Sequence, residues 1–150
     1  MKAVIQRVSN AVVSVNDKTI GQIGHGLLIL LGIEDKDNAA DVLWLANKII
    51  GMRIFSDENG KMNLNLSSIG GELLVISQFT LHASTKKGTR PSYIKAARPE
   101  KAIQLYEEFI SECEAITSKS VQSGEFGANM KVELLNDGPV TIIIDSQNRE

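Results

Sequence analysis

The apolar run at residues 27–33 (LLILLGI) is the feature that most restricts how this sequence can fold. Gly24, Gly26 and Glu34 bound the run, and its length is that of a strand rather than of a helix. A strand with no polar alternation is typical of a sheet interior, where both faces are covered. We therefore expect a sheet that buries this segment on both sides.

Further strand patterns lie before and after this run. Apolar and polar residues alternate over residues 1–15, which predicts a long, half-buried strand with a bulge near Ser9 and Asn10. The segment 136–139 (NDGP) has the residue types of a tight turn, so we expect it to join the last two strands. The remaining predicted strands are residues 19–23, 52–55, 72–81, 131–135 and 140–145.

Hydrophobic residues recur at helical spacing in two places. The first predicted helix is capped by Asp37, runs to about residue 50 and ends at Gly51. The second begins at Pro99, which suits a first helical turn, and continues to about Ile116. Two helices among many strands indicate a mixed α/β (α+β) fold with a curved sheet as its core.

Composition and length indicate one globular domain over residues 1–150, because 43% of the residues are hydrophobic, 23% are charged, and no repeat or linker interrupts the chain. The single cysteine, Cys113, cannot form an internal disulfide, and its place in a helical pattern favours a buried core thiol over a nucleophile. No signal-like start and no apolar run of about 18 residues occur, so we expect a cytoplasmic protein that does not enter a membrane.

Positive charge is concentrated in one segment of an otherwise acidic chain. The formal net charge is −2, which argues against a general nucleic-acid coat. Residues 86–101 nevertheless hold one acid, Glu100, and six cationic residues: Lys86, Lys87, Arg90, Lys95, Arg98 and Lys101. This distribution suits docking of one phosphate-rich ligand. It is equally compatible with a solvated loop and helix start.

Motifs for metals and common cofactors are missing from the sequence. His25 and His82 have no HxxxH spacing, and neither CxxC, GxGxxG nor GxxxxGK[ST] occurs, so we expect no metal ion and no cofactor. The remaining candidate is the hydroxyl-rich end of a predicted strand at residues 77–81 (SQFTL), directly before the basic segment. Polar residues that end a buried strand are a common place for ligand contacts.

Two readings stay open for each polar candidate. Strand alternation would place Thr80 and His82 on one face as nucleophile and base, although a third, orienting group is absent. The hydroxyls of Ser77 and Thr80 could instead bond to the backbone of the sheet. Gly138 and Pro139 are either part of a hairpin turn or a rigid pair that presents bare carbonyl oxygens to a ligand.

Two motifs, SQFTL and NDGPVT, occur in this order and at a characteristic separation. They carry most of a resemblance that runs from end to end: the chain is similar to the D-aminoacyl-tRNA deacylase (D-tyrosyl-tRNA deacylase) family. Small departures are Tyr93, where the family usually has Phe, and His82, at a variable position. The segments that match are residues 1–8 (MKAVIQRV), 61–63 (KMN), 77–81 (SQFTL), 86–92 (KKGTRPS) and 136–141 (NDGPVT).

The resemblance implies a barrel-like, mostly antiparallel sheet and a homodimer with its active site at the interface. Such enzymes hydrolyse the ester between a D-amino acid and the terminal adenosine of tRNA, and they also clear glycine mischarged on alanine tRNA. It further implies a cis bond between Gly138 and Pro139, and that their carbonyl oxygens reach into the partner's pocket and exclude L residues. Arg7 would brace this loop, while Lys86, Lys87 and Arg90 would contact phosphates of the acceptor stem.

For catalysis, the resemblance implies that the backbone N–H groups of Phe79 and Thr80 hold the developing oxyanion. Gln78 would orient the substrate and Ser77 would complete the site. The 2′-hydroxyl of the substrate would assist the attack, with Thr80 as covalent nucleophile being the alternative. A non-catalytic RNA-binding module and a hydrolase of other small esters are the rival functions.

Overall fold

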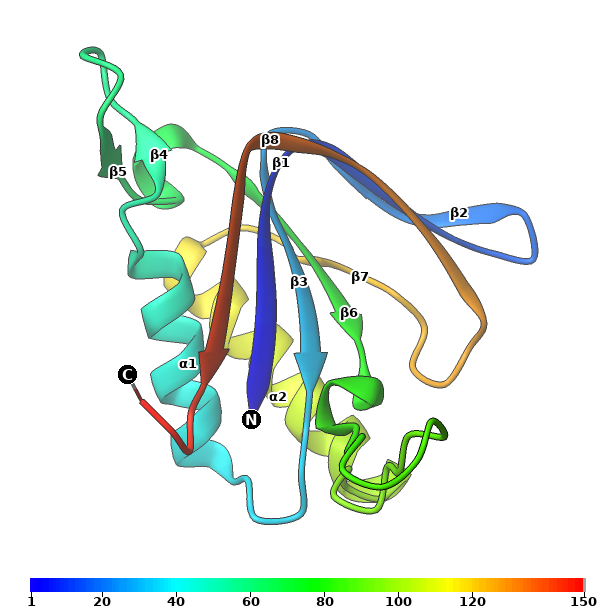
Figure 1. The fold of residues 1–150 in the computed structure, drawn as a ribbon. Helices are drawn as coiled ribbons and strands as arrows, with labels where there is room; N and C mark the ends of the chain where they lie inside the picture. The colour runs from blue at the N-terminus through cyan, green and yellow to red at the C-terminus, as the bar shows by residue number, and fades with distance from the viewer. Residues whose placement is uncertain (150) are drawn as a thin grey trace.

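The computed structural model describes residues 1–149, and in it a nearly closed, barrel-like sheet packs against two helices (Figure 1). The sheet has the strand order β2-β1-β3-β6-β7, and β8 pairs with β1 off this path. A small second sheet contains β4 and β5. The strands are β1 Lys2–Val15, β2 Lys18–Ile23, β3 Gly26–Gly32, β4 Phe55–Ser56, β5 Met62–Leu64, β6 Glu72–Ser77, β7 Gln122–Ser123 and β8 Met130–Asp145; the helices are α1 Ala39–Gly51 and α2 Pro99–Thr117, with short 3₁₀ turns η1 Ser67–Ile69 and η2 Phe79–His82.

Strand β3 is buried on both faces, as its apolar run predicts. It pairs antiparallel with β1 on one side and parallel with β6 on the other. Leu27, Ile29 and Leu31 face the helices and join the larger core, whereas Leu28 faces the inside of the curved sheet. The mixed α/β class and the curved sheet are therefore confirmed. Most strand pairings are antiparallel, and the two parallel ones are β3 with β6 and β6 with β7.

The long strands β1 and β8 bend, and this bend closes the sheet. The first half of β1 pairs with β3 and the second half with β2, while β8 runs along nearly its whole length. The pairing of β1 with β8 shifts register between Val8 and Asn10, so the predicted bulge there is confirmed. Strand β2 comes back against β7: a Cβ atom on Gly21 would lie 3.0 Å from the carbonyl oxygen of Ser123.

The predicted hairpin at residues 136–139 is wrong. Strand β8 continues through this segment and stays paired with β1 on both sides of it. Gln6 faces Thr141 and Val8 faces Asn136, so extra residues of β8 are accommodated as a bulge. Glycine and proline suit bulges as well as turns, which is why the residue types alone misled the prediction.

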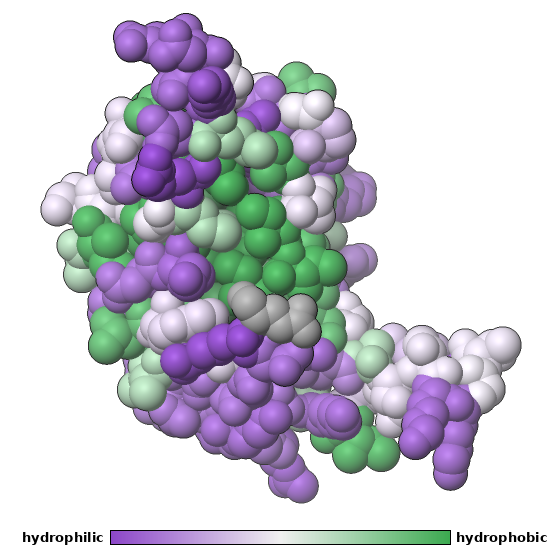
Figure 2. All heavy atoms as spheres, turned by 60° about the vertical axis from the view of Figure 1, so that its left-hand side comes forward, coloured by the Kyte–Doolittle hydropathy of each residue, from purple (hydrophilic) through white to green (hydrophobic). Residues whose placement is uncertain are grey.

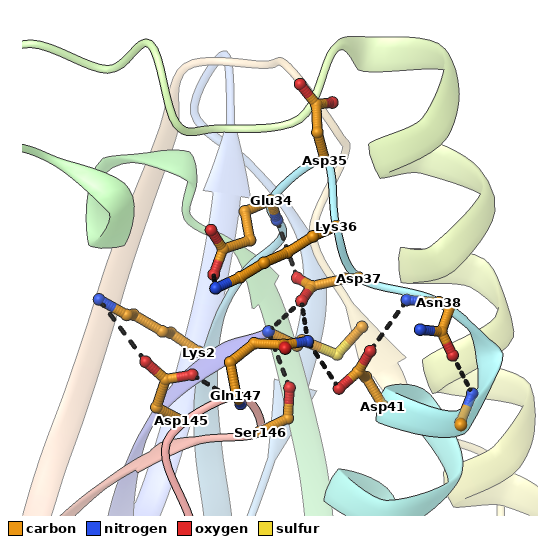
Figure 3. A network of polar contacts seen from close by, with 12 residues as sticks. Lys2, Glu34, Asp35, Lys36, Asp37, Asn38, Asp41, Asp145, Ser146 and Gln147 are labelled. Atoms are coloured by element: carbon orange, nitrogen blue, oxygen red, sulfur yellow. Dashed lines mark hydrogen bonds and ion pairs between the residues drawn. The ribbon is translucent and has the colours of Figure 1, made fainter.

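The start of α1 also differs from the prediction. Asn38, not Asp37, is the N-cap: its side chain accepts a hydrogen bond from the N–H of Ala40, and the Asp41 carboxylate accepts one from the N–H of Asn38. Asp37 is fully buried and pairs with the ammonium group of Met1 (Figure 3). Gly51 is the last helical residue rather than the residue after it.

Two predicted strands are shorter than expected. The one at residues 52–55 is reduced to β4, which begins only at Phe55. The one at residues 72–81 ends at Ser77, and the chain then makes the 3₁₀ turn η2. No helix within residues 1–149 is long and apolar enough to span a membrane.

Helix α2 begins at Pro99, as predicted, and supplies buried side chains to the larger core. Tyr106 donates a hydrogen bond to the carbonyl oxygen of Val75, and burial raises the pKa of its hydroxyl to about 12. Burial also raises the pKa of the Cys113 thiol to about 12. Cys113 is thus a protonated core residue, in agreement with its predicted structural role.

Candidate active site

A pocket of about 580 Å³ opens where strand β6 ends. Its walls come from the ends of β3 and β6, the turn η2, the start of α2 and the chain leading into β8. Most of the lining is apolar, which is typical of small-molecule sites that use few polar groups for orientation. The lining residues are Leu31, Ile33, Ile76, Ser77, Gln78, Phe79, Tyr93, Ala96, Ala97, Arg98, Pro99, Ala102, Phe126, Gly127, Ala128, Met130 and Val132.

Three of the four predicted catalytic residues lie in the pocket wall: Ser77, Gln78 and Phe79. The N–H of Gln78 donates to the carbonyl oxygen of Leu31 at 2.7 Å, which fixes the point where the chain leaves the sheet. Phe79 is 56% exposed and packs edge-on against Tyr93, with ring centres 5.1 Å apart. Three residues that the sequence analysis names as candidates thus lie together on one side of the pocket.

Thr80 follows directly, but its side chain is outside the pocket lining. The Thr80 hydroxyl accepts a hydrogen bond from the Gln78 amide nitrogen at 2.5 Å. The first N–H groups of a 3₁₀ turn have no partner inside that turn, so η2 leaves the N–H groups of Phe79 and Thr80 free for a ligand.

The predicted pairing of Thr80 with His82 is wrong, because it assumed strand alternation where the chain forms a 3₁₀ turn. His82 is buried, with 3% of its surface exposed, whereas Thr80 is only partly buried. No residue of the described chain bonds to the buried Nε2 of His82. Thr80 therefore has no imidazole base beside it.

Gly138 and Pro139 lie in the bulge of β8, and the bond between them is cis. Arg7 holds this bulge: its Nε donates to the carbonyl oxygen of Asp137 at 3.0 Å, and its Nη1 donates to the carbonyl oxygen of Ile54 at 2.5 Å. Gly138 has a φ of 118°, and a Cβ atom there would lie 2.6 Å from Nη2 of Arg7. Only glycine fits at this position.

The bulge of β8 and the SQFT segment lie at opposite ends of the sheet. The bulge of β8 lies beside Arg7 of β1, and Arg7 pairs with Leu27 at the start of β3. Ser77, in contrast, pairs with Leu31 near the end of β3. Four residues of strand correspond to about 13 Å. In Figure 1 the bend of β8 is at the top and η2 is at the bottom. A single chain thus does not bring Gly138 and Pro139 to the pocket.

The basic residues Lys86, Lys87 and Arg90 lie in the exposed loop between η2 and α2. A bridge between Ser84 and Ser92 closes this loop, and Tyr93 then leads into the pocket wall. In residues 1–149, none of the three cations forms an ion pair. The loop is therefore a positively charged surface next to the pocket.

One wall was not anticipated from the sequence. Phe126, Gly127 and Ala128 lie in the chain between β7 and β8, where no periodic pattern predicted an element. No group of three His, Cys, Asp or Glu side chains within the described residues is arranged to hold a metal ion.

Comparison with known proteins places this architecture in a family. The family model described as D-Tyr-tRNA(Tyr) deacylase matches residues 4–145. The chain belongs to the D-aminoacyl-tRNA deacylase family. It is therefore an enzyme of the hydrolase class.

Relatives of the same length share more than half of their residues with this chain. The chain is 61% identical to the D-aminoacyl-tRNA deacylase of Flavobacterium psychrophilum and 59% identical to that of Akkermansia muciniphila, with both chains of each pair fully covered.

Two solved structures are similar to this chain over nearly its whole length. A c-Myc DNA unwinding element binding protein is 37% identical with a TM-score of 0.91, over 97% of this chain and 98% of that one. A probable eukaryotic D-amino acid tRNA deacylase, 16% identical, has the same fold with a TM-score of 0.82, over 95% and 97% of the two chains.

Proposed function

We propose that residues 1–150 form a single domain that hydrolyses the ester bond of D-aminoacyl-tRNA and releases the D-amino acid and free tRNA. The observation that carries the proposal is the pocket lined by Ser77, Gln78 and Phe79, next to the unpaired cations of the basic loop. The pocket is large enough for an aminoacylated nucleoside. The acceptor stem then extends over Lys86, Lys87 and Arg90, which attract its phosphates. Such a reaction on tRNA belongs in the cytoplasm.

In the proposed reaction, water adds to the ester carbonyl, the bond to the ribose oxygen breaks, and that oxygen takes up a proton. The free N–H groups of Phe79 and Thr80 stabilise the negative charge that develops on the carbonyl oxygen. Gln78 orients the substrate and Ser77 borders the ester. The Thr80 hydroxyl accepts from Gln78 and has no base beside it, which supports assistance by the 2′-hydroxyl of the substrate over covalent attack by Thr80.

The working unit in this proposal is a homodimer in which each pocket receives Gly138 and Pro139 from the partner. The separation of about 13 Å along β3 between the two segments supports an exchange between chains. Strand β8 also exposes apolar side chains, with Leu135 57% and Ile143 73% exposed. Apolar side chains gather in the middle of the face drawn in Figure 2. Apolar surface of this kind marks interaction sites.

Selection of the substrate follows from the same bulge. Carbonyl oxygens of Gly138 and Pro139 accept hydrogen bonds from the α-amino group of a D residue, and the side chain of an L residue would clash with them. Glycine has no side chain to reject, so the enzyme would also clear glycine mischarged on alanine tRNA. The resulting activity is chiral proofreading in translation.

The decisive experiment measures release of amino acid from D- and L-tyrosyl-tRNA by the purified protein. We expect rapid release from the D substrate only. Stable binding of tRNA without release would favour a non-catalytic nucleic-acid-binding module; one structural relative is named as a DNA-binding protein. Equal cleavage of simple esters that lack tRNA would favour a general esterase.

A further inference from the structure

Among residues 1–149, Arg98 is the only charged side chain in the wall of the pocket. It is the residue directly before α2, so the first turn of a 19-residue helix fixes its backbone. Its side chain is exposed. Lys101, one turn later, points elsewhere and bonds to the carbonyl oxygen of Asp35. A cation on a rigid element at the rim of an apolar pocket is suited to hold an anionic part of a ligand.

The guanidinium of Arg98 is also free. Three other arginines, Arg7, Arg53 and Arg149, each donate to backbone carbonyl oxygens. Within residues 1–149, Arg98 has neither an ion pair nor a side-chain hydrogen bond; it occupies the N-cap position of α2, but its side chain makes no capping hydrogen bond. No contact with the residues that the structure describes therefore explains its place in the wall.

The rest of the pocket indicates what lies next to this cation. Phe79, Tyr93 and Phe126 give the pocket aromatic walls, which suit a nucleobase. A nucleoside inside the pocket is connected to the remainder of its RNA through the phosphate on its 5′ oxygen. That phosphate has to leave the apolar interior at the rim, where a fixed guanidinium can donate two hydrogen bonds to it.

We propose that Arg98 is a substrate-binding residue that pairs with the 5′-phosphate of the terminal nucleotide. The inference rests on the proposed function, since it places the aminoacylated nucleoside in this pocket. Arg98 differs in role from Lys86, Lys87 and Arg90, which are on an exposed loop and contact phosphates further along the stem. It binds one phosphate at a fixed distance from the ester, so it positions the reacting end of the substrate.

The test compares two small substrates that differ by one phosphate: adenosine and 5′-AMP, each esterified with D-tyrosine. For the unmodified enzyme, we expect kcat/KM to be about tenfold higher on the AMP ester. A factor of about ten corresponds to the net free energy of one charge-assisted hydrogen bond. Arg98→Ala should lose this preference, mainly through KM, and keep its kcat/KM on the adenosine ester. Arg98→Lys should retain part of the preference. Lys48→Ala, which removes a cation from the last turn of α1, is the matched control and should show the same preference as the unmodified enzyme.

Three results would overturn the inference. One is an equal loss on both esters in Arg98→Ala, which indicates a structural role. A second is an unmodified enzyme that shows no preference for the phosphate. A third is an enzyme that hydrolyses D-tyrosyl-tRNA but neither small ester, because the terminal nucleotide is then not held in this pocket. Failure to hydrolyse D-tyrosyl-tRNA itself would instead contradict the proposed function.

Discussion

The side-chain amide of Gln78 donates to the hydroxyl of Thr80 at 2.5 Å, and no imidazole lies beside that hydroxyl to remove its proton. We therefore predict that Thr80→Ala retains hydrolysis of D-tyrosyl-tRNA within about tenfold, roughly 1.4 kcal/mol of barrier. Loss of a covalent nucleophile would cost several powers of ten. Single-turnover rates measure the difference, with Thr80→Ser as the matched control.

The same question can be asked from the substrate. If the 2′-hydroxyl assists the attack, a tRNA ending in 2′-deoxyadenosine should react far more slowly than the normal tRNA. A Thr80→Ala enzyme that is folded by circular dichroism but fully inactive, together with normal turnover of the deoxy substrate, would return the nucleophile role to Thr80.

Mixed dimers test whether the bulge of β8 acts on the partner's pocket. Gly138→Ala places a methyl group against Arg7 in a backbone conformation that side chains rarely adopt, so this variant should lose activity. Gln78→Ala should lose activity through the pocket. A mixture of the two chains, unfolded and refolded together, should regain activity, because one pocket per mixed dimer has an intact Gln78 and an intact partner loop. No recovery in verified mixed dimers would mean that each chain completes its own site.

The sequence predicted the two helices and the buried strand β3, because each has a clear local pattern. It also named Ser77, Gln78 and Phe79 as candidates, and these residues line the pocket. It failed where tertiary contacts decide the local structure. The residue types of Gly138 and Pro139 predicted a turn. The residues of β8 before and after them pair with β1, however, so the two residues lie inside a strand. The residue pattern also predicted that Thr80 and His82 continue the strand. The N–H of Gln78 instead donates to the carbonyl oxygen of Leu31, and the chain then leaves the sheet.

The buried ion pair at the start of the chain had no sequence signal. The Met1 ammonium lies 2.5 Å from the Asp37 carboxylate, and both groups are fully buried (Figure 3). We predict that Asp37→Ala lowers the free energy of unfolding by about 3–5 kcal/mol, because it leaves an unpaired charge inside the protein. Asp35→Ala, two residues away and exposed, is the control and should change stability by less than about 0.5 kcal/mol. Urea denaturation measures both; similar values for the two variants would contradict a stabilising role for the pair.

Alkaline pH should reveal the burial of Tyr106. Its pKa is raised from 10.0 to about 12, so the folded state holds the hydroxyl proton more tightly than the unfolded chain does. The stabilisation is complete below pH 10 and is lost as the pH rises toward 12. Tyr106→Phe should therefore weaken the decline in stability over this range, the remaining slope being due partly to Cys113. Identical pH profiles for both proteins would show that Tyr106 is not protected from ionisation.

The basic loop should govern capture of tRNA and leave chirality unchanged. Lys86, Lys87 and Arg90 are exposed and unpaired within the described chain, so salt should screen their attraction to phosphate. Replacing all three with Ala should raise KM and flatten its dependence on salt. Chirality depends on a steric clash at Gly138 and Pro139, which salt does not screen. The rates on D- and L-tyrosyl-tRNA should therefore be measured for the triple variant across a salt series. A D-over-L ratio that falls together with affinity would show that capture and selection are not performed by separate segments.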